Sequence, residues 1–115
     1  MVAVPPHRFA ELVDDAIDAL PPQLLRMLDN VVVQIAEVDD EDDQLLGLYR
    51  GVALTDRTHD YAFELPDTIT IYRRPIMAMC RTEAEVAREV SVTVAHEIGH
   101  HFGIAEDRLH ELGWG

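Results

Sequence analysis

Histidine and glutamate side chains gather near the carboxyl-terminal end of the sequence, in VAHEIGHHFGIAEDRLHELGW, residues 94–114. His96 and His100 are four residues apart, so on a helix both project from one face, about one turn apart. Two imidazoles placed in this way can bind one tetrahedral zinc ion. Glu97 lies about 100° around the helix from His96, where its carboxylate can contact a metal-bound water. The HExxH pattern therefore predicts a zinc site with Glu97 as general base.

A zinc site of this kind requires a third protein ligand, and three downstream residues are candidates. Gly103 is expected to end the helix and turn the chain. In proteases with the HExxHxxGxxH pattern, the residue three positions after this glycine binds the metal, and here that residue is Glu106. Asp107 is the second candidate. His110 is the third, because it shares a face with Glu106 if residues 105–112 are helical. We expect Glu106 to be the ligand.

Two other histidines are less favourably placed. His101 points about 100° away from His100, so it cannot easily reach the same ion, and we interpret it as a packing or outer-shell residue. His59 lies before Asp60 in a segment without sustained periodicity, and we interpret it as an exposed loop residue.

Helices are predicted on either side of the central part of the sequence. Apolar residues recur at three- and four-residue spacing over residues 9–20, between two proline pairs, which predicts a core-facing N-terminal helix. The helix that carries the HExxH pattern begins at TEAE, where Thr82 can cap the first turn while Glu85 reaches back. Its second half is apolar on nearly all sides, which predicts a buried helix.

The central part of the sequence favours strands. A short helix entered at Pro22 leads into NVVVQIAEV, residues 30–38, whose β-branched residues favour a strand. DTITIYRRPI, residues 67–76, alternates apolar and polar side chains, and Pro75 is expected to end this strand or to mark it as an edge. Residues 45–61 are punctuated by glycine and are predicted to form a long loop or a hairpin.

Composition narrows the classes of function. The chain has 115 residues and a formal charge of −13, from nine basic and 22 acidic residues, so it lacks the basic footprint of a nucleic-acid binder or an anionic-membrane binder. Five acids at residues 39–43 lack the ligand spacing of a calcium loop and predict a solvated surface loop. Cys80 is the single cysteine, which excludes an intrachain disulfide and predicts a buried or half-buried thiol. Without a signal peptide or membrane span, we expect one cytoplasmic domain over residues 1–115.

Four segments together resemble the bacterial zincin-like family of metallopeptidases, also called minimal metalloprotease-like proteins. They are LDNVVVQIAE, LLGLYRGVALTDR, LPDTITIYRRPI and the HExxH segment, at residues 28–37, 45–57, 65–76 and 94–114. The resemblance covers nearly the whole chain, and the last segment is highly specific.

The resemblance implies a fold and a site. The fold is α+β, a minimal zincin-like domain in which a small sheet packs against the HExxH helix and the N-terminal helix. The site would hold Zn²⁺ through His96 and His100, with Glu97 as catalytic base and an acidic residue at position 106. The implied activity is hydrolysis of peptide bonds in a peptide or protein substrate.

We expect the substrate to lie extended along the strand at residues 67–76 and to pair with its backbone. Tyr72 and Arg73 are candidate contacts to the substrate or the oxyanion. Larger HExxHxxGxxH proteases have a methionine turn downstream of the third ligand, whereas Met77 and Met79 lie upstream here. We therefore expect a shallow site, or one that a second subunit or partner protein completes.

Two alternative functions stay open at the level of sequence. The first is a metal-binding adaptor or regulatory protein with little or no proteolytic turnover, in which the metal ion stabilises the fold. The second is hydrolysis of a non-peptide amide or ester, for which the zinc chemistry would be the same and only the pocket would differ.

Overall fold

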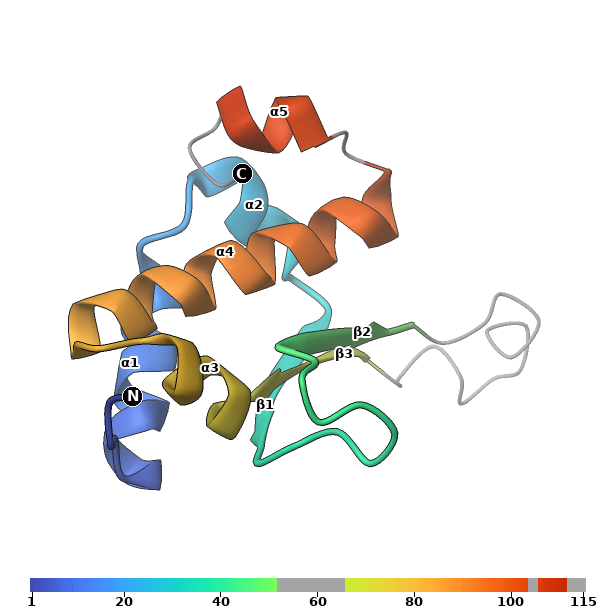
Figure 1. Cartoon of the computed structure of the whole chain (residues 1–115). Helices are drawn as coiled ribbons and strands as arrows, with labels where there is room; N and C mark the ends of the chain where they lie inside the picture. Colours follow the sequence, from blue (N-terminus) through green and yellow to red (C-terminus); the bar gives the residue numbers. More distant parts are fainter. Residues whose placement is uncertain (52–65, 104–105, 112–115) are drawn as a thin grey trace.

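A small mixed sheet and the long helix that packs on it form the centre of the molecule (Figure 1). The computed structural model describes residues 1–51, 66–103 and 106–111, except for the side chains of Glu106, Leu109 and His110. The expected α+β fold is confirmed.

The sheet contains three strands in the described part of the chain. Strand β1 (Val31–Ala36) pairs in parallel with β3 (Asp67–Tyr72), and β2 (Gly47–Arg50) pairs antiparallel with β3, so the strand order is β1-β3-β2. Strand β3 is therefore central and is mostly buried along its length. Strands β1 and β2 form the two edges of the sheet.

Two expectations for the segment at residues 67–76 are wrong. The strand ends at Tyr72, and the chain turns at once into helix α3 (Arg73–Met79). Pro75 therefore lies in the first turn of a helix, where its missing N–H removes no hydrogen bond. The segment is also not at a sheet edge, because β3 has a hydrogen-bonded neighbour on each side.

The segment at residues 45–61, expected to form a long loop or a hairpin, contains strand β2. Residues 47–50 form β2 and pair antiparallel with β3, the next strand along the chain. Residues 52–61, with His59 among them, lie outside the described residues.

Both predicted helices before the sheet are confirmed. Helix α1 (Pro6–Asp18) begins within one proline pair, and α2 (Pro22–Met27) begins within the other. Helix α1 buries one apolar stripe, which packs mainly on helix α4 (Glu83–Phe102). The residues of this stripe are Phe9, Leu12, Val13 and Ala16.

The predicted ends of α4 are confirmed, with one change in the cap. The Thr82 side chain accepts a hydrogen bond from the Glu85 N–H at 3.1 Å. The Glu85 carboxylate reaches back to the Arg81 N–H at 2.6 Å, one residue earlier than in an ordinary capping box. At the other end, Gly103 adopts a left-handed conformation with φ of 72°, which favours glycine. The local sequence thus sets both ends of the helix.

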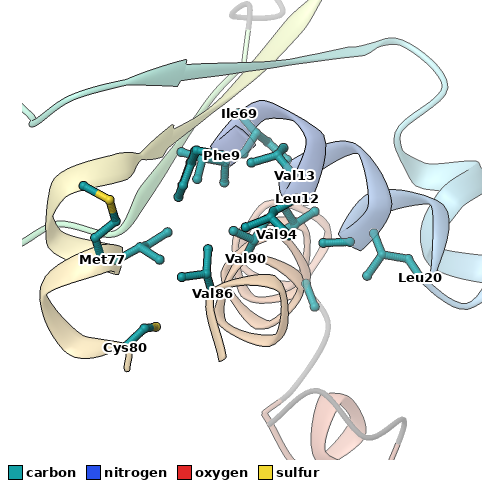
Figure 2. Close-up of a cluster of buried hydrophobic side chains, with 14 of the residues drawn as sticks. Phe9, Leu12, Val13, Leu20, Ile69, Met77, Cys80, Val86, Val90 and Val94 are labelled. Carbon is teal, nitrogen blue, oxygen red and sulfur yellow. The ribbon is translucent and has the colours of Figure 1, made fainter. Parts of the chain in front are cut away.

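The hydrophobic core lies between α1, α4 and β3 (Figure 2). Side chains of α4 that enter this core include Val86, Val90, Val94 and Ile98, all fully buried, and Ile69 of β3 meets them. Cys80 is also buried, as predicted, and burial raises the pKa of its thiol. None of the helices in the described ranges is long and apolar enough to cross a membrane.

Candidate active site

The side chains of His96, Glu97 and His100 line one hollow beside β2. This hollow, called here the α4 hollow, has a volume of about 430 Å³. His96 and Glu97 are half-buried, and His100 is exposed. The two imidazole rings have centroids 6.5 Å apart and planes inclined by 61°. Residues of α4, β2 and the acidic loop complete the lining: Asp42, Gln44, Leu45, Leu46, Gly47, Glu89, Val92 and Thr93.

The orientation of α4 follows from the residues that it buries. Val94, Ala95 and Ile98 are fully buried and belong to the hydrophobic core. Because successive helix positions are about 100° apart, burying these residues turns His96 and Glu97 towards the strand edge. The prediction of all-round burial fails on the side that lines the hollow, where Val92, His96 and Glu97 are half-buried, and in the last turn, where Phe102 is 48% exposed.

The Glu97 carboxylate lies in an environment that raises its pKa. Burial is the largest cause, and it outweighs the lowering effects of the His100 and His96 imidazoles and of a hydrogen bond from the Tyr49 main-chain N–H. A carboxylate with a raised pKa accepts a proton more readily than an ordinary one. The position therefore suits a general base.

Strand β2 passes unusually close to the HExxH residues. A Cβ atom added to Gly47 would lie 2.6 Å from Thr93 Cγ2 and 3.2 Å from the Thr70 carbonyl oxygen. Only a glycine fits this approach without displacing the helix or the strand. The close contact places the edge of the sheet next to Glu97, whose Cγ would be 3.7 Å from the same Cβ.

The antiparallel pairing of β2 with β3 leaves the main-chain N–H and C=O groups of two β2 residues directed away from β3. The Tyr72 N–H donates to the Leu46 carbonyl, and alternate positions of an antiparallel pair share this arrangement. The main-chain groups of Leu48 therefore face β3, whereas those of Gly47 and Tyr49 face away from it. The outward N–H of Tyr49 meets the Glu97 carboxylate.

The third metal ligand is not settled by the described residues. Glu106 and His110 lie in helix α5 (Glu106–Glu111), which follows Gly103, but their side chains are outside the described part of the chain. The Asp107 side chain is exposed, and its carboxylate accepts a hydrogen bond from the Arg108 N–H. Among the described side chains, no group of three or more histidine, cysteine, aspartate or glutamate residues could hold a metal ion.

The structure places Tyr72 and Arg73 away from the α4 hollow. The Tyr72 hydroxyl donates to Asp39 at 2.9 Å. The Arg73 guanidinium donates to both Glu37 oxygens at 2.7 Å and to the Val4 carbonyl. Neither residue lines the hollow, so the expectation that they contact the substrate or oxyanion is replaced by structural roles. The cause is the end of β3 at Tyr72, after which the chain leaves the sheet.

His101 is a packing residue, as one of the two sequence interpretations proposed. Its ring stacks on Tyr49 with centroids 3.9 Å apart and planes inclined by 16°.

The sequence did not indicate Tyr49 and Asp67, whose side chains are joined by a hydrogen bond of 2.8 Å from the tyrosine hydroxyl. One signal was available, since a glycine in a strand, such as Gly47, often marks a close backbone approach.

The acidic loop is a turned surface segment, as predicted. Its side chains at residues 40–43 are exposed. The Asp39 carboxylate accepts hydrogen bonds from the N–H groups of Glu41 and Asp42, which fold the loop back on itself. Asp42 also lines the α4 hollow.

Comparison with known proteins agrees with this architecture. A family model described as zincin-like metallopeptidase matches residues 28–114, and the chain belongs to that family. A solved structure, a conserved hypothetical protein from Thermo thermophilus, is similar with a TM-score of 0.55 and 23% sequence identity, over 84% of this chain and 92% of that chain. This likeness shows the fold alone. The search of curated proteins found no match.

Proposed function

We propose that this protein is a zinc-dependent peptidase with Glu97 as general base. One observation carries the proposal: His96, Glu97 and His100 share a single hollow beside β2, an edge strand of the described sheet. Membership of the zincin-like metallopeptidase family supports the same class of reaction.

The residues present fit a zinc ion. Two imidazoles one helical turn apart are a common zinc-binding pair. The rings of His96 and His100, with centroids 6.5 Å apart, would each offer one nitrogen to a shared ion. We propose Glu106 as the third ligand, because Gly103 ends α4 and the chain then enters α5 at Glu106. When bound, zinc would polarise the scissile carbonyl and lower the pKa of a coordinated water.

Glu97 would move the proton during hydrolysis. Its carboxylate, with a pKa raised by burial, would take a proton from the attacking water. The same carboxyl group would then return the proton to the amine nitrogen of the leaving peptide.

We propose that the substrate lies along the outer edge of β2. The described part of the sheet has no strand beyond β2, and the peptide group of Gly47 faces outwards into the α4 hollow. An extended peptide can pair with such an edge through main-chain hydrogen bonds. This location replaces the earlier expectation of pairing along β3, which is enclosed by both of its neighbours.

The experiment that tests this proposal combines metal analysis with substrate profiling. We expect about one zinc ion per chain, as a single HExxH site implies, in protein purified without chelator or nickel resin. We also expect the zinc-loaded protein to cleave members of a diverse peptide library. Glu97→Gln should retain zinc and the fold but lower kcat by about a hundredfold or more.

Glu11→Gln is the matched control, since it neutralises an exposed carboxylate of α1 outside the α4 hollow and should leave cleavage unchanged. Zinc-loaded protein that cleaves no peptide would reject the peptidase proposal in favour of a metal-binding adaptor. Loss of zinc from folded Glu97→Gln would show that Glu97 is a ligand and not the base.

A further inference from the structure

Tyr49 uses its ring, its hydroxyl and its main-chain N–H to join β2 to the end of α4 and to β3. Its ring stacks on His101, with centroids 3.9 Å apart, and meets the Phe102 ring edge-on at 6.4 Å. Its hydroxyl donates to Asp67 at 2.8 Å. Its main-chain N–H donates to the Glu97 carboxylate. One residue of the strand thus touches the general base and the turn that follows it.

Asp67 is an unusual residue for the first position of a central strand. It is only 7% exposed, and a buried carboxylate costs free energy unless it is hydrogen-bonded. The Tyr49 hydroxyl supplies such a bond, and His101 Nε2 lies 3.6 Å from the same carboxylate oxygen. Asp67 is itself held in place, because its N–H donates to the Asn30 carbonyl. It offers Tyr49 a rigid acceptor.

The sequence of β2 leaves Tyr49 as its only side chain on the α4 face. Side chains alternate along a strand, so Gly47 and Tyr49 face α4, whereas Leu48 and Arg50 face the other side. Gly47 has no side chain with which to hold the strand. Four residues paired on one side only make a weak strand. The position of β2 relative to α4 therefore depends on the Tyr49 ring and hydroxyl.

We propose that Tyr49 is a positioning residue that keeps its own main-chain N–H on the Glu97 carboxylate, with Asp67 and His101 as its anchors. The N–H bond orients the carboxylate towards the α4 hollow. A single N–H donor leaves the remaining lone pairs of the carboxylate available to the attacking water. The catalytic consequence rests on the proposed peptidase function, whereas the contact itself does not.

Hydrogen exchange of the Tyr49 amide, followed by NMR on the zinc-free protein, tests the contact directly. The Tyr49 N–H faces away from β3, so its protection should depend on Glu97. We expect exchange to accelerate about tenfold in Glu97→Ala, the effect of losing one hydrogen bond. The Leu48 N–H, which faces β3, should keep its wild-type rate and so report that the hairpin is intact.

Variants of the anchors test the role of the side chain. Tyr49→Leu removes the stacked ring and the hydroxyl. It should accelerate hydrogen exchange of the main-chain amide at position 49 as much as Glu97→Ala does. Tyr49→Phe keeps the stack and should retain part of the protection. Wild-type exchange at position 49 in either Glu97→Ala or Tyr49→Leu, with a normal rate at Leu48, would overturn the inference.

Kinetics of the zinc-loaded protein then separate positioning from simple stability. Tyr49→Leu should lower kcat on a cleaved peptide by about tenfold, with KM and zinc affinity changed by less than about twofold, and Tyr49→Phe should recover part of kcat. An equal effect on zinc affinity would assign Tyr49 a structural role instead. If the exchange pattern holds but no peptide is cleaved, the peptidase proposal fails and the contact between Tyr49 and Glu97 stands.

Discussion

The two faces of the sheet each present a tyrosine, a carboxylate and a hollow, but the pKa of the carboxylate is shifted in opposite directions on the two faces. On the face away from α4, the outer hollow of about 240 Å³ contains Tyr72 and Asp39. A hydrogen bond from the Tyr72 hydroxyl, helped by main-chain N–H groups, lowers the pKa of Asp39. On the α4 face, burial raises the pKa of Glu97, which receives one main-chain N–H from Tyr49.

The difference shows what separates a structural carboxylate from a basic one. Several donors stabilise the charge of Asp39, so it is a weak base and serves to fold the acidic loop. Glu97 is half-buried and accepts a main-chain hydrogen bond from Tyr49, so its charge is less stabilised and its affinity for a proton is higher. The two tyrosine hydroxyls also differ. The Tyr72 hydroxyl donates to Asp39 itself, whereas the Tyr49 hydroxyl donates to Asp67 and not to Glu97.

The largest expected effect tests whether metal binding belongs to the α4 face alone. His96→Ala and His100→Ala should each abolish zinc binding near neutral pH, because each removes one of two imidazole ligands. Asp39→Ala, which changes the outer hollow, should retain zinc. Metal content by mass spectrometry after dialysis measures both outcomes. Full zinc occupancy in the double alanine variant would disprove the assignment.

A smaller loss of zinc should identify the third ligand. Glu106→Ala should weaken zinc binding by at least the roughly 10- to 100-fold that loss of an outer-shell partner costs. Asp107→Ala and His110→Ala should change the zinc dissociation constant little. Competition with a chromogenic chelator gives the three values. If His110→Ala weakens binding and Glu106→Ala does not, His110 is the ligand and the HExxH assignment remains.

The contact between β2 and α4 should contribute to stability as well as to geometry. Gly47→Ala places a Cβ atom 2.6 Å from Thr93 Cγ2 and should lower the free energy of unfolding by about 1–3 kcal/mol, measured by urea denaturation. Thr93→Ser removes the clashing methyl group and should restore part of this loss in the double variant. Arg50→Ala, an exposed change on the same strand, should have little effect. If Thr93→Ser restores no stability to Gly47→Ala, the loss does not come from a clash with the Thr93 methyl group.

The smallest expected effect concerns the outer hollow and depends on pH. Tyr72→Phe removes the hydrogen bond that most lowers the pKa of Asp39, so it should reduce stability slightly at neutral pH. A carboxyl with a lowered folded-state pKa contributes stability that is present above its unfolded pKa of about 3.9. This contribution is lost as pH falls through the folded pKa. The difference between wild type and Tyr72→Phe should therefore shrink in acid.

Urea denaturation of both proteins between neutral pH and acid measures this change. Peptide cleavage and zinc affinity at neutral pH should be the same in wild type and Tyr72→Phe, since Tyr72 does not line the α4 hollow. A difference in stability that stays constant down to low pH would show that Tyr72 acts through packing and not through Asp39.

The sequence by itself determined the features that depend on local geometry. The four-residue spacing of His96 and His100 puts both on one helical face, whatever the rest of the fold. The side chain of Thr82 and the left-handed conformation of Gly103 set the ends of α4 through contacts within one turn of each. The buried apolar stripe of α1 follows from the same periodicity.

Only the tertiary structure decided which strand lies beside Glu97 and what holds it there. The alternating pattern of β3 is compatible with an edge or a centre, and its central place comes from pairing with β1 and β2, which lie elsewhere in the chain. Tyr49 and Asp67 are 18 residues apart, and His101 lies on another element. Such contacts depend on strand register and on how α4 packs across the sheet, and no local periodicity encodes either.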